Sequence, residues 1–256
     1  MNVRVPDPAV RYIAFGDSNT AGPAERDYPD ILRELLDEPV GAFANEGKSG
    51  ESTEEGLVRL GMLLSERIYP NASVLLYWEG GKEIVDFIQD HDPLLFSAAD
   101  DPSYHYTEEL VEVLAKVQSN IEQAISSAAD AGLTVYIATY FPLAPGPAEC
   151  DALPLDIMLP FQAGNANSYL MMLNEHIRGA AAKQGATIVD VEASADVLQE
   201  NPANYFDCNH LSASGNEVVA HLFCDAIEKS SAKRSSGKLR DQPVAISGGT
   251  GKLVRR

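Results

Sequence analysis

Short apolar segments that alternate with longer amphipathic ones constrain the fold of this sequence more than any other feature. The apolar segments have the length and composition of buried strands and comprise residues 11–15, 41–45, 72–78, 134–140 and 187–191. Apolar residues at helical spacing follow in residues 28–38, 52–68, 107–131, 166–184 and 213–229. Strands separated by helices form a parallel sheet that helices cover on both faces. The sequence therefore predicts an α/β protein, with a three-layer α/β/α arrangement around a central five-stranded parallel sheet.

The length of the chain and the composition of its last residues predict its domain organisation. At 256 residues, one domain is the default, and we place it at residues 1–230. Residues 231–256 are rich in Ser, Gly and Lys, and from Ser230 onward there are seven Lys or Arg residues and one acid, Asp241. We expect this basic segment to be a disordered tail.

The net charge and the cysteines narrow the classes of partner and compartment. A formal net charge of −19 repels nucleic acid and anionic membranes, so we expect neither as a partner. No apolar run approaches the roughly 18 residues that a membrane helix needs. The start, "MNVRVPDPAVRY", resembles no signal peptide, so we expect a cytoplasmic protein. Cys150, Cys208 and Cys224 lack metal-type spacing and predict idle thiols rather than a disulfide framework.

Ser18 is a candidate nucleophile. It lies in "AFGDSNTAG", just past an apolar strand segment, in a turn where Gly16 permits unusual backbone angles. A serine in such a turn can equally be a helix-cap or turn residue. The G-x-S-x-G elbow of α/β-hydrolases surrounds none of the serines, which disfavours that class.

Asp207 and His210, in "YFDCNHLSASG", are candidates for the base that a serine nucleophile needs. They are three residues apart, so one tight turn can point both side chains the same way. The carboxylate could then bind one ring nitrogen of His210 and leave the other free to take a proton. An Asp-x-x-His turn on its own is more often a helix cap.

Gly50 is a candidate oxyanion donor. It lies in "NEGKSGEST", after the second strand segment and just before an expected helix start. Unpaired N–H groups gather at helix starts, so this N–H could point into the same crevice as Ser18. The alternative is an ordinary loop glycine.

Together these candidates resemble the sequence blocks of the GDSL, or SGNH, hydrolase family. The matching runs, in the family's order, are "GDSNT", "NEGKSGES", "WEGGKE" and "DCNH", and the resemblance covers about residues 11–225.

The resemblance implies a three-layer α/β/α fold of the flavodoxin-like type and hydrolysis of a small-molecule ester, without a metal or organic cofactor. It implies that Ser18 is the nucleophile and, by its own N–H, an oxyanion donor, with Gly50 as the second donor. His210 would be the general base and acid, and Asp207 its orienting partner. The resemblance says nothing of oligomeric state.

Lys82 is the departure from the family pattern. The third block of the family reads Gly-x-Asn-Asp, and its Asn side chain is the third oxyanion donor, whereas the matching run here is Gly80-Gly81-Lys82-Glu83. An ammonium on a long flexible stem does not replace an amide directly. Three roles are open for Lys82: a substitute donor, a binder of an anionic substrate group, or the mark of a weakened or inactive relative.

Three function classes follow from these residues. The first is a serine esterase, whose acyl pocket could be lined by Leu153, Leu155, Ile157, Met158, Leu159 and Phe161 of the irregular segment 141–164. The second is a catalytically weakened binding protein on the same fold, which holds an anionic ligand through Lys82. The third, a flavodoxin-like nucleotide binder, requires a phosphate-binding glycine loop, and no convincing one is present.

Overall fold

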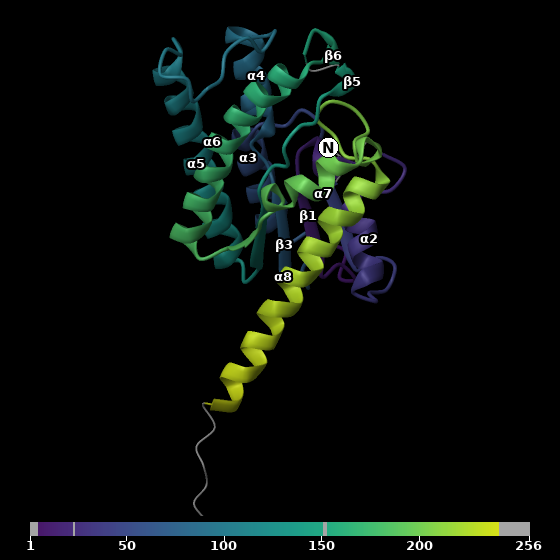
Figure 1. Cartoon of the computed structure of the whole chain (residues 1–256). Helices are drawn as coiled ribbons and strands as arrows, with labels where there is room; N and C mark the ends of the chain where they lie inside the picture. Colours follow the sequence, from purple (N-terminus) through teal and green to yellow (C-terminus); the bar gives the residue numbers. More distant parts are fainter. Residues whose placement is uncertain (1–4, 23, 151–152, 241–256) are drawn as a thin grey trace, which may run out of the picture.

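The central sheet has five parallel strands, as the sequence predicts. The computed structural model describes residues 5–22, 24–150 and 153–240, and the side chains of all of these except 147–150 and 233–240. The strands are β1 (Tyr12–Gly16), β2 (Phe43–Gly47), β3 (Val74–Trp78), β4 (Thr134–Ala138) and β7 (Thr187–Val189), in the order β2-β1-β3-β4-β7 (Figure 1). This is the order of flavodoxin-like sheets.

Helices cover both faces of the sheet, which makes three layers. On one side α2 (Tyr28–Leu35) packs against α8 (Ala213–Arg240), and on the other side α5 (Thr107–Asp130) packs against α3 (Thr53–Ser65) and α6 (Pro160–Gln184) (Figure 1). Successive side chains of a strand point to opposite faces. Accordingly, Trp78 of β3 contacts Tyr28 of α2, whereas Tyr77 stacks on Phe15, over which Arg59 of α3 lies.

The strand register brings three loops to one edge of the sheet. Gly16, the last residue of β1, is paired with Gly47 at the end of β2 and with Trp78 at the end of β3. All three strands run in the same direction, so the loops that follow them begin side by side. Residues far apart in the sequence are therefore neighbours at this edge.

The structure differs from the predicted elements in two places near that edge. The run after β3 forms a helix, α4 (Gly81–His91), and the segment expected to be irregular contains an antiparallel hairpin of β5 (Gly146–Cys150) and β6 (Leu155–Met158). In α4 the buried side chains Ile84, Phe87 and Ile88 repeat at helical spacing. Gly80 and Gly81 at the start of this helix are typical of a turn, so the sequence does not predict the helix there.

Short helices complete the described chain: α1 (Ser18–Ala21), α7 (Ala195–Glu200), and the 3₁₀ helices η1 (Glu192–Ser194) and η2 (Pro202–Asn204). The predicted boundary at residue 230 falls inside α8, so residues 231–240 are helical, and the rest of the expected tail lies outside the described residues.

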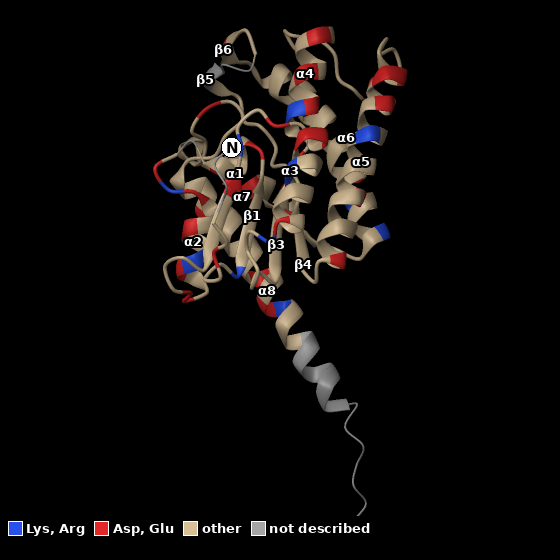
Figure 2. Ribbon diagram, turned by 180° about the vertical axis from the view of Figure 1, so that it is seen from behind, with Lys and Arg blue, Asp and Glu red and all other residues tan. Residues whose placement is uncertain are grey.

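The described residues reflect the net charge of the sequence. Along the ribbon, Asp and Glu positions are more frequent than Lys and Arg positions (Figure 2). No helix within the described residues is long and apolar enough to cross a bilayer.

Candidate active site

Ser18 begins the short helix α1, directly after β1. Asp17 caps this helix, because its Oδ1 accepts a hydrogen bond from the Asn19 N–H at 2.9 Å. The N–H of Ser18 is at the first helical position and therefore has no acceptor within the helix. Ser18 itself lies on the wall of the cavity beyond the sheet edge.

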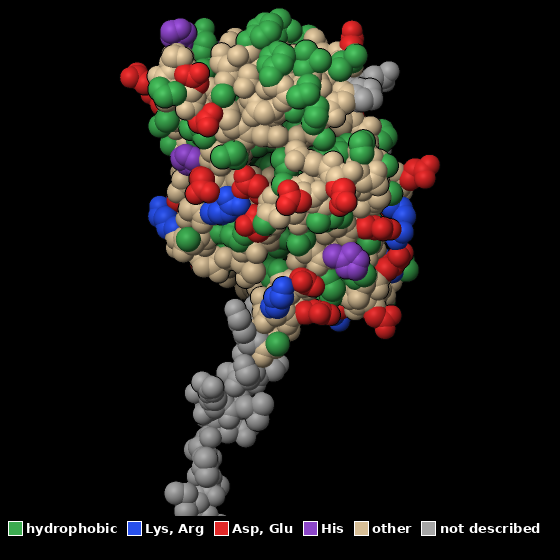
Figure 3. Space-filling model, in the orientation of Figure 1, with side chains coloured by type: hydrophobic (Ala, Val, Ile, Leu, Met, Phe, Trp, Pro, Cys, Tyr) green, Lys and Arg blue, Asp and Glu red, His purple; other side chains and the backbone are tan. Residues whose placement is uncertain are grey.

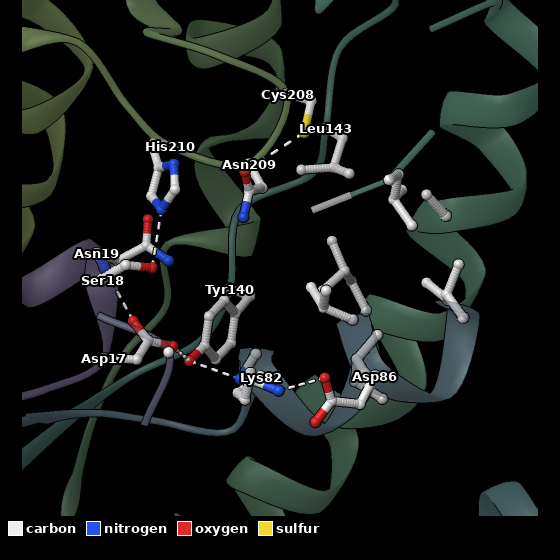
Figure 4. Close-up of a pocket in the computed structure, with 18 of the residues that line it drawn as sticks. Asp17, Ser18, Asn19, Lys82, Asp86, Tyr140, Leu143, Cys208, Asn209 and His210 are labelled. Atoms are coloured by element: carbon white, nitrogen blue, oxygen red, sulfur yellow. Dashed lines mark hydrogen bonds and ion pairs between the residues drawn. The ribbon is translucent and has the colours of Figure 1, made fainter. Parts of the chain in front are cut away.

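Ser18, His210 and Asp207 form a continuous hydrogen-bonded chain, of which Figure 4 shows the contact between Ser18 and His210. The Nε2 of His210 lies 2.8 Å from the Ser18 Oγ, and its Nδ1 lies 2.7 Å from the Asp207 Oδ2. The other oxygen of Asp207 accepts hydrogen bonds from the backbone N–H of His210 at 2.8 Å and of Asn209 at 2.9 Å. The carboxylate is therefore held in place by its own turn and can hold the imidazole in one orientation.

Gly50 lies on the wall of the same cavity as Ser18. Its φ of 72° is in the left-handed region, which favours glycine at this position. Within the described residues no acceptor is paired with its backbone N–H. The Gly50 N–H thus belongs to a residue of the cavity wall, and its role as an oxyanion donor stays a prediction.

Lys82 also lies on the cavity wall, in the first turn of α4. Its ammonium is ion-paired with Asp86, one helical turn further on, and points away from Ser18 (Figure 4). An ammonium with this partner is both displaced from the serine and partly neutralised.

A buried network that the sequence analysis did not find joins the loops after β1, β3 and β4. The hydroxyl of Tyr140 donates to the Oδ2 of Asp17 at 2.5 Å and accepts the N–H of Gly81 at 2.8 Å. Burial raises the pKa of Asp17, and the Tyr140 hydroxyl opposes that rise. The turn beneath Ser18 is thereby tied to the start of α4. No signal in the sequence links Tyr140 to these blocks.

A cavity of about 390 Å³ opens beside Ser18. Apart from the site residues its wall is mainly apolar and comes from α4, α6 and the loops after β4: Ile84, Val85, Ile88, Phe141, Leu143, Leu153, Ala166 and Leu170. Of the six side chains expected to line an acyl pocket, only Leu153 does so. Ile157, Leu159 and Phe161 are instead exposed, and hydrophobic side chains gather at this end of the molecule (Figure 3).

Cys208, between Asp207 and His210, is disulfide-bonded, so the expectation of idle thiols is wrong for this residue. Sequence spacing could not predict the bond, because a disulfide depends on proximity in the fold. Cys224 is a free, buried cysteine. Among the described residues no group of His, Cys, Asp or Glu could hold a metal ion.

Solved structures of similar fold are hydrolases by name. A lipase from a goat rumen metagenome has a TM-score of 0.60 at 18% identity, with 85% of this chain and 97% of that chain covered. A GDSL-like lipase from Bacteroides thetaiotaomicron gives 0.54 at 15% identity over 89% and 92% of the two chains. A lipase/acylhydrolase from Enterococcus faecalis gives 0.53 at 18% identity over 86% and 96%. A comparison with curated proteins finds no match.

The solved structures share the fold of this chain, a three-layer α/β/α arrangement around a parallel sheet. The family model "GDSL-like Lipase/Acylhydrolase family" matches residues 14–218, which is most of the chain. The chain therefore belongs to the GDSL-like lipase/acylhydrolase family.

Proposed function

We propose that the protein is a serine hydrolase that cleaves carboxylic esters of small molecules through Ser18. The observation that carries the proposal is the unbroken hydrogen-bonded chain from the Ser18 Oγ through His210 to Asp207. Such a chain supplies a nucleophile, a base and an orienting acid in one geometry.

In the proposed first half-reaction, His210 takes the proton of the Ser18 hydroxyl while the Oγ attacks the carbonyl carbon of the ester. The carbonyl oxygen becomes an oxyanion, which accepts hydrogen bonds from the N–H groups of Ser18 and Gly50. The tetrahedral intermediate then collapses, and His210 gives the proton to the departing alcohol oxygen. Water, activated by the same imidazole, releases the acid and restores Ser18.

The mainly apolar cavity beside Ser18 supports an acyl group that is itself apolar. Its wall from Ile84 to Ile88 on α4 and from Ala166 to Leu170 on α6 carries no charge apart from Asp86. A cavity of about 390 Å³ is at the small end of ligand-binding pockets. We therefore propose short acyl esters as substrates. Because of the net charge of −19, we propose neither nucleic acid nor a membrane as a partner.

The cytoplasmic location remains a prediction, and the disulfide bond of Cys208 argues against it. Disulfides are rare in reducing compartments, so the disulfide at Cys208 favours an oxidising one.

Covalent labelling by a fluorophosphonate, measured by intact mass, tests the proposal. We expect one adduct on the wild-type chain and none on Ser18→Ala. A folded wild-type chain that takes no label would contradict the proposal, since Ser18 would then not be an activated nucleophile.

The alternative, a non-catalytic protein that binds an anionic ligand through Lys82, is less supported because Asp86 already pairs with the ammonium. It predicts thermal stabilisation by small anions without turnover. Loss of that stabilisation in Lys82→Met, with no ester hydrolysis by the wild type, would favour it over the esterase.

A further inference from the structure

Glu79 is a buried acid beneath the loops that carry the proposed oxyanion donors. It directly follows β3, just before Gly80 and α4, and only 1% of it is exposed. Gly56 of α3 makes room for it, since a Cβ at that position would clash with the Glu79 carboxyl group. An acid placed so deeply has to be neutralised, either by a cation or by a proton.

Arg59 is too heavily engaged to neutralise Glu79. Its guanidinium binds Glu51 through Nε, which lies 2.9 Å from both carboxylate oxygens, and through Nη2. Its Nη1 lies 3.4 Å from Glu46, whereas the closest approach to Glu79 is 4.0 Å. Lys48 provides a second cation, and it too contacts Glu51, at 3.2 Å. Arg59 and Lys48 are therefore shared among the carboxyl groups of Glu46, Glu51 and Glu79. The negative charge of Glu79 is the one that they neutralise least.

One oxygen of Glu79 has no hydrogen-bond donor among the described residues. The Tyr77 hydroxyl donates to Oε2 at 2.9 Å, but Oε1 is buried and unpaired. The carboxyl groups of Glu51 and Glu79 flank the same Arg59 nitrogen, because Nη2 binds Glu51 Oε2 and lies 4.0 Å from Glu79 Oε1. A hydrogen bond with Glu51 also raises the pKa of Glu79. Two carboxylates cannot bond to each other unless one of them carries a proton. A proton on Oε1 of Glu79 satisfies this oxygen, and Glu51 is its acceptor.

We propose that Glu79 is a positioning residue whose carboxyl proton, donated to Glu51, holds the loop of Gly50 against the start of α4. Glu51 directly follows Gly50, and Glu79 directly precedes Gly80 and Gly81, so the shared proton joins two walls of the proposed oxyanion site. This inference rests on the proposed ester hydrolysis. It adds a pair of acids that never touches the substrate but sets the spacing of the donors.

The protonation of Glu79 persists at neutral pH because its surroundings oppose its charge. Burial raises the pKa of Glu79 to about 10, the Glu51 and Asp17 carboxylates raise it as well, and the Tyr77 hydroxyl opposes the rise. The titratable or charged groups around it come from several elements: Asp17 after β1, Glu46 on β2, Lys48 and Glu51 after β2, Arg59 on α3, Tyr77 on β3, Glu83 on α4 and Tyr140 after β4.

Ionisation of Glu79 has two consequences for catalysis. The shared proton is lost, so two carboxylates repel each other where one hydrogen bond held the loops together. A negative charge also appears beneath the position where the oxyanion develops, which opposes the transition state. We therefore expect the reaction at Ser18 to slow as the pH approaches 10.

The test measures the rate of fluorophosphonate labelling of Ser18 from neutral to alkaline pH in four full-length chains. For the wild type we expect the rate to fall by half near pH 10. Glu79→Gln keeps the shape and a donor but cannot ionise, so it should retain the neutral rate within about threefold and lose the alkaline decline. Glu79→Leu, which has no donor, should be slower by about tenfold or more at every pH.

Glu46→Gln is the matched control, because Glu46 contacts the same arginine but is adjacent in sequence to neither Gly50 nor Gly80. It should keep the wild-type pH profile. Circular dichroism at each pH shows whether a loss of rate is a loss of fold. An infrared band of a protonated carboxyl group at neutral pH, absent in Glu79→Gln, should report the proton independently of the reaction.

The outcomes separate this inference from the proposed function. Two results would overturn the role of Glu79 and leave the esterase proposal intact. One is an alkaline decline in the labelling rate of Glu79→Gln that equals that of the wild type. The other is the absence of the carboxyl band from the wild type. A wild type that takes no label at any pH overturns both. A flat profile in Glu79→Gln alone, with the band present in the wild type, supports the inference.

Discussion

The substitution Lys82→Asn restores the family residue at the third block, and we expect it to increase turnover. In this structure the ammonium of Lys82 is bound by Asp86 and points away from Ser18, so Lys82 directs no donor toward the serine (Figure 4). Removal of one oxyanion donor typically lowers kcat about 100- to 1000-fold, or about 2.7–4 kcal/mol of transition-state stabilisation. An added amide on an otherwise unchanged wall should recover part of this, and we expect a gain of about 10- to 100-fold in kcat.

The cost of this substitution to stability should be small. The Lys82–Asp86 pair is one turn apart on a helix, with 34% and 47% of the two side chains exposed. Such pairs contribute about 0.3–0.5 kcal/mol. A cation in the first turn of a helix is in addition disfavoured by the helix dipole, which offsets part of the loss. The melting temperature should therefore hardly move, and any change in turnover can be assigned to the site.

The assay is kcat for a short-chain p-nitrophenyl ester, with Lys82→Met as the matched control. Met keeps the length of the side chain but has neither donor nor charge, so we expect its kcat to stay within about threefold of the wild type. A fall of about 100-fold in Lys82→Met would show that Lys82 is a working donor and would refute this reasoning. An unchanged or lower kcat in Lys82→Asn would also refute it.

Three further predictions concern other contacts of the site. Asp207→Asn should lower kcat by about 1000-fold or more, measured on the same ester, because an amide does not hold the required tautomer of His210; a loss below tenfold would contradict the role of Asp207. Tyr140→Phe removes the hydroxyl donor of the buried Asp17, which should cost about 1–3 kcal/mol in urea unfolding and lower kcat, whereas unchanged values would contradict a positioning role. Glu79→Gln should stabilise the chain increasingly as pH rises. The folded-state pKa of Glu79, about 10, is above the ordinary glutamate value of 4.5, so the wild type loses stability as the pH rises from 4.5 to about 10, by up to about 1.4 kcal/mol per pH unit; an equal pH dependence of the unfolding free energy in the two chains would contradict it.

The sheet is predictable from the sequence because its strands are short apolar runs with clear ends. The run "VLLYW" is buried along most of its length, and no helix of that length would be stable alone. Helix α4 was not predictable, because its start lacks clear helix signals. Gly80 and Gly81 at its start are typical of a turn, and no side chain caps it, so local sequence hides a helix that packing of Ile84 and Phe87 stabilises.

The site is predictable to the extent that its residues belong to recognisable blocks. Ser18, Gly50, Asp207 and His210 all belong to such runs. The strand register aligns the loops of Ser18 and Gly50, and hydrogen bonds join His210 to Ser18 and to Asp207. Tyr140 and the apolar walls from α4 and α6 belong to no block. Their places depend on how helices pack on the sheet, which periodicity alone does not specify.

The close fit between Gly56 and Glu79 has a consequence for how the two positions can evolve. Any side chain at position 56 would occupy the space of the Glu79 carboxyl group, so the glycine has to be in place before the acid can be fixed. Among relatives of this chain, we expect an acid at position 79 only together with glycine at position 56. In lineages with a larger residue at 56, a small or neutral residue should occupy position 79. The two positions would then be inherited as a unit, and their joint presence would mark the branch of the family to which this chain belongs.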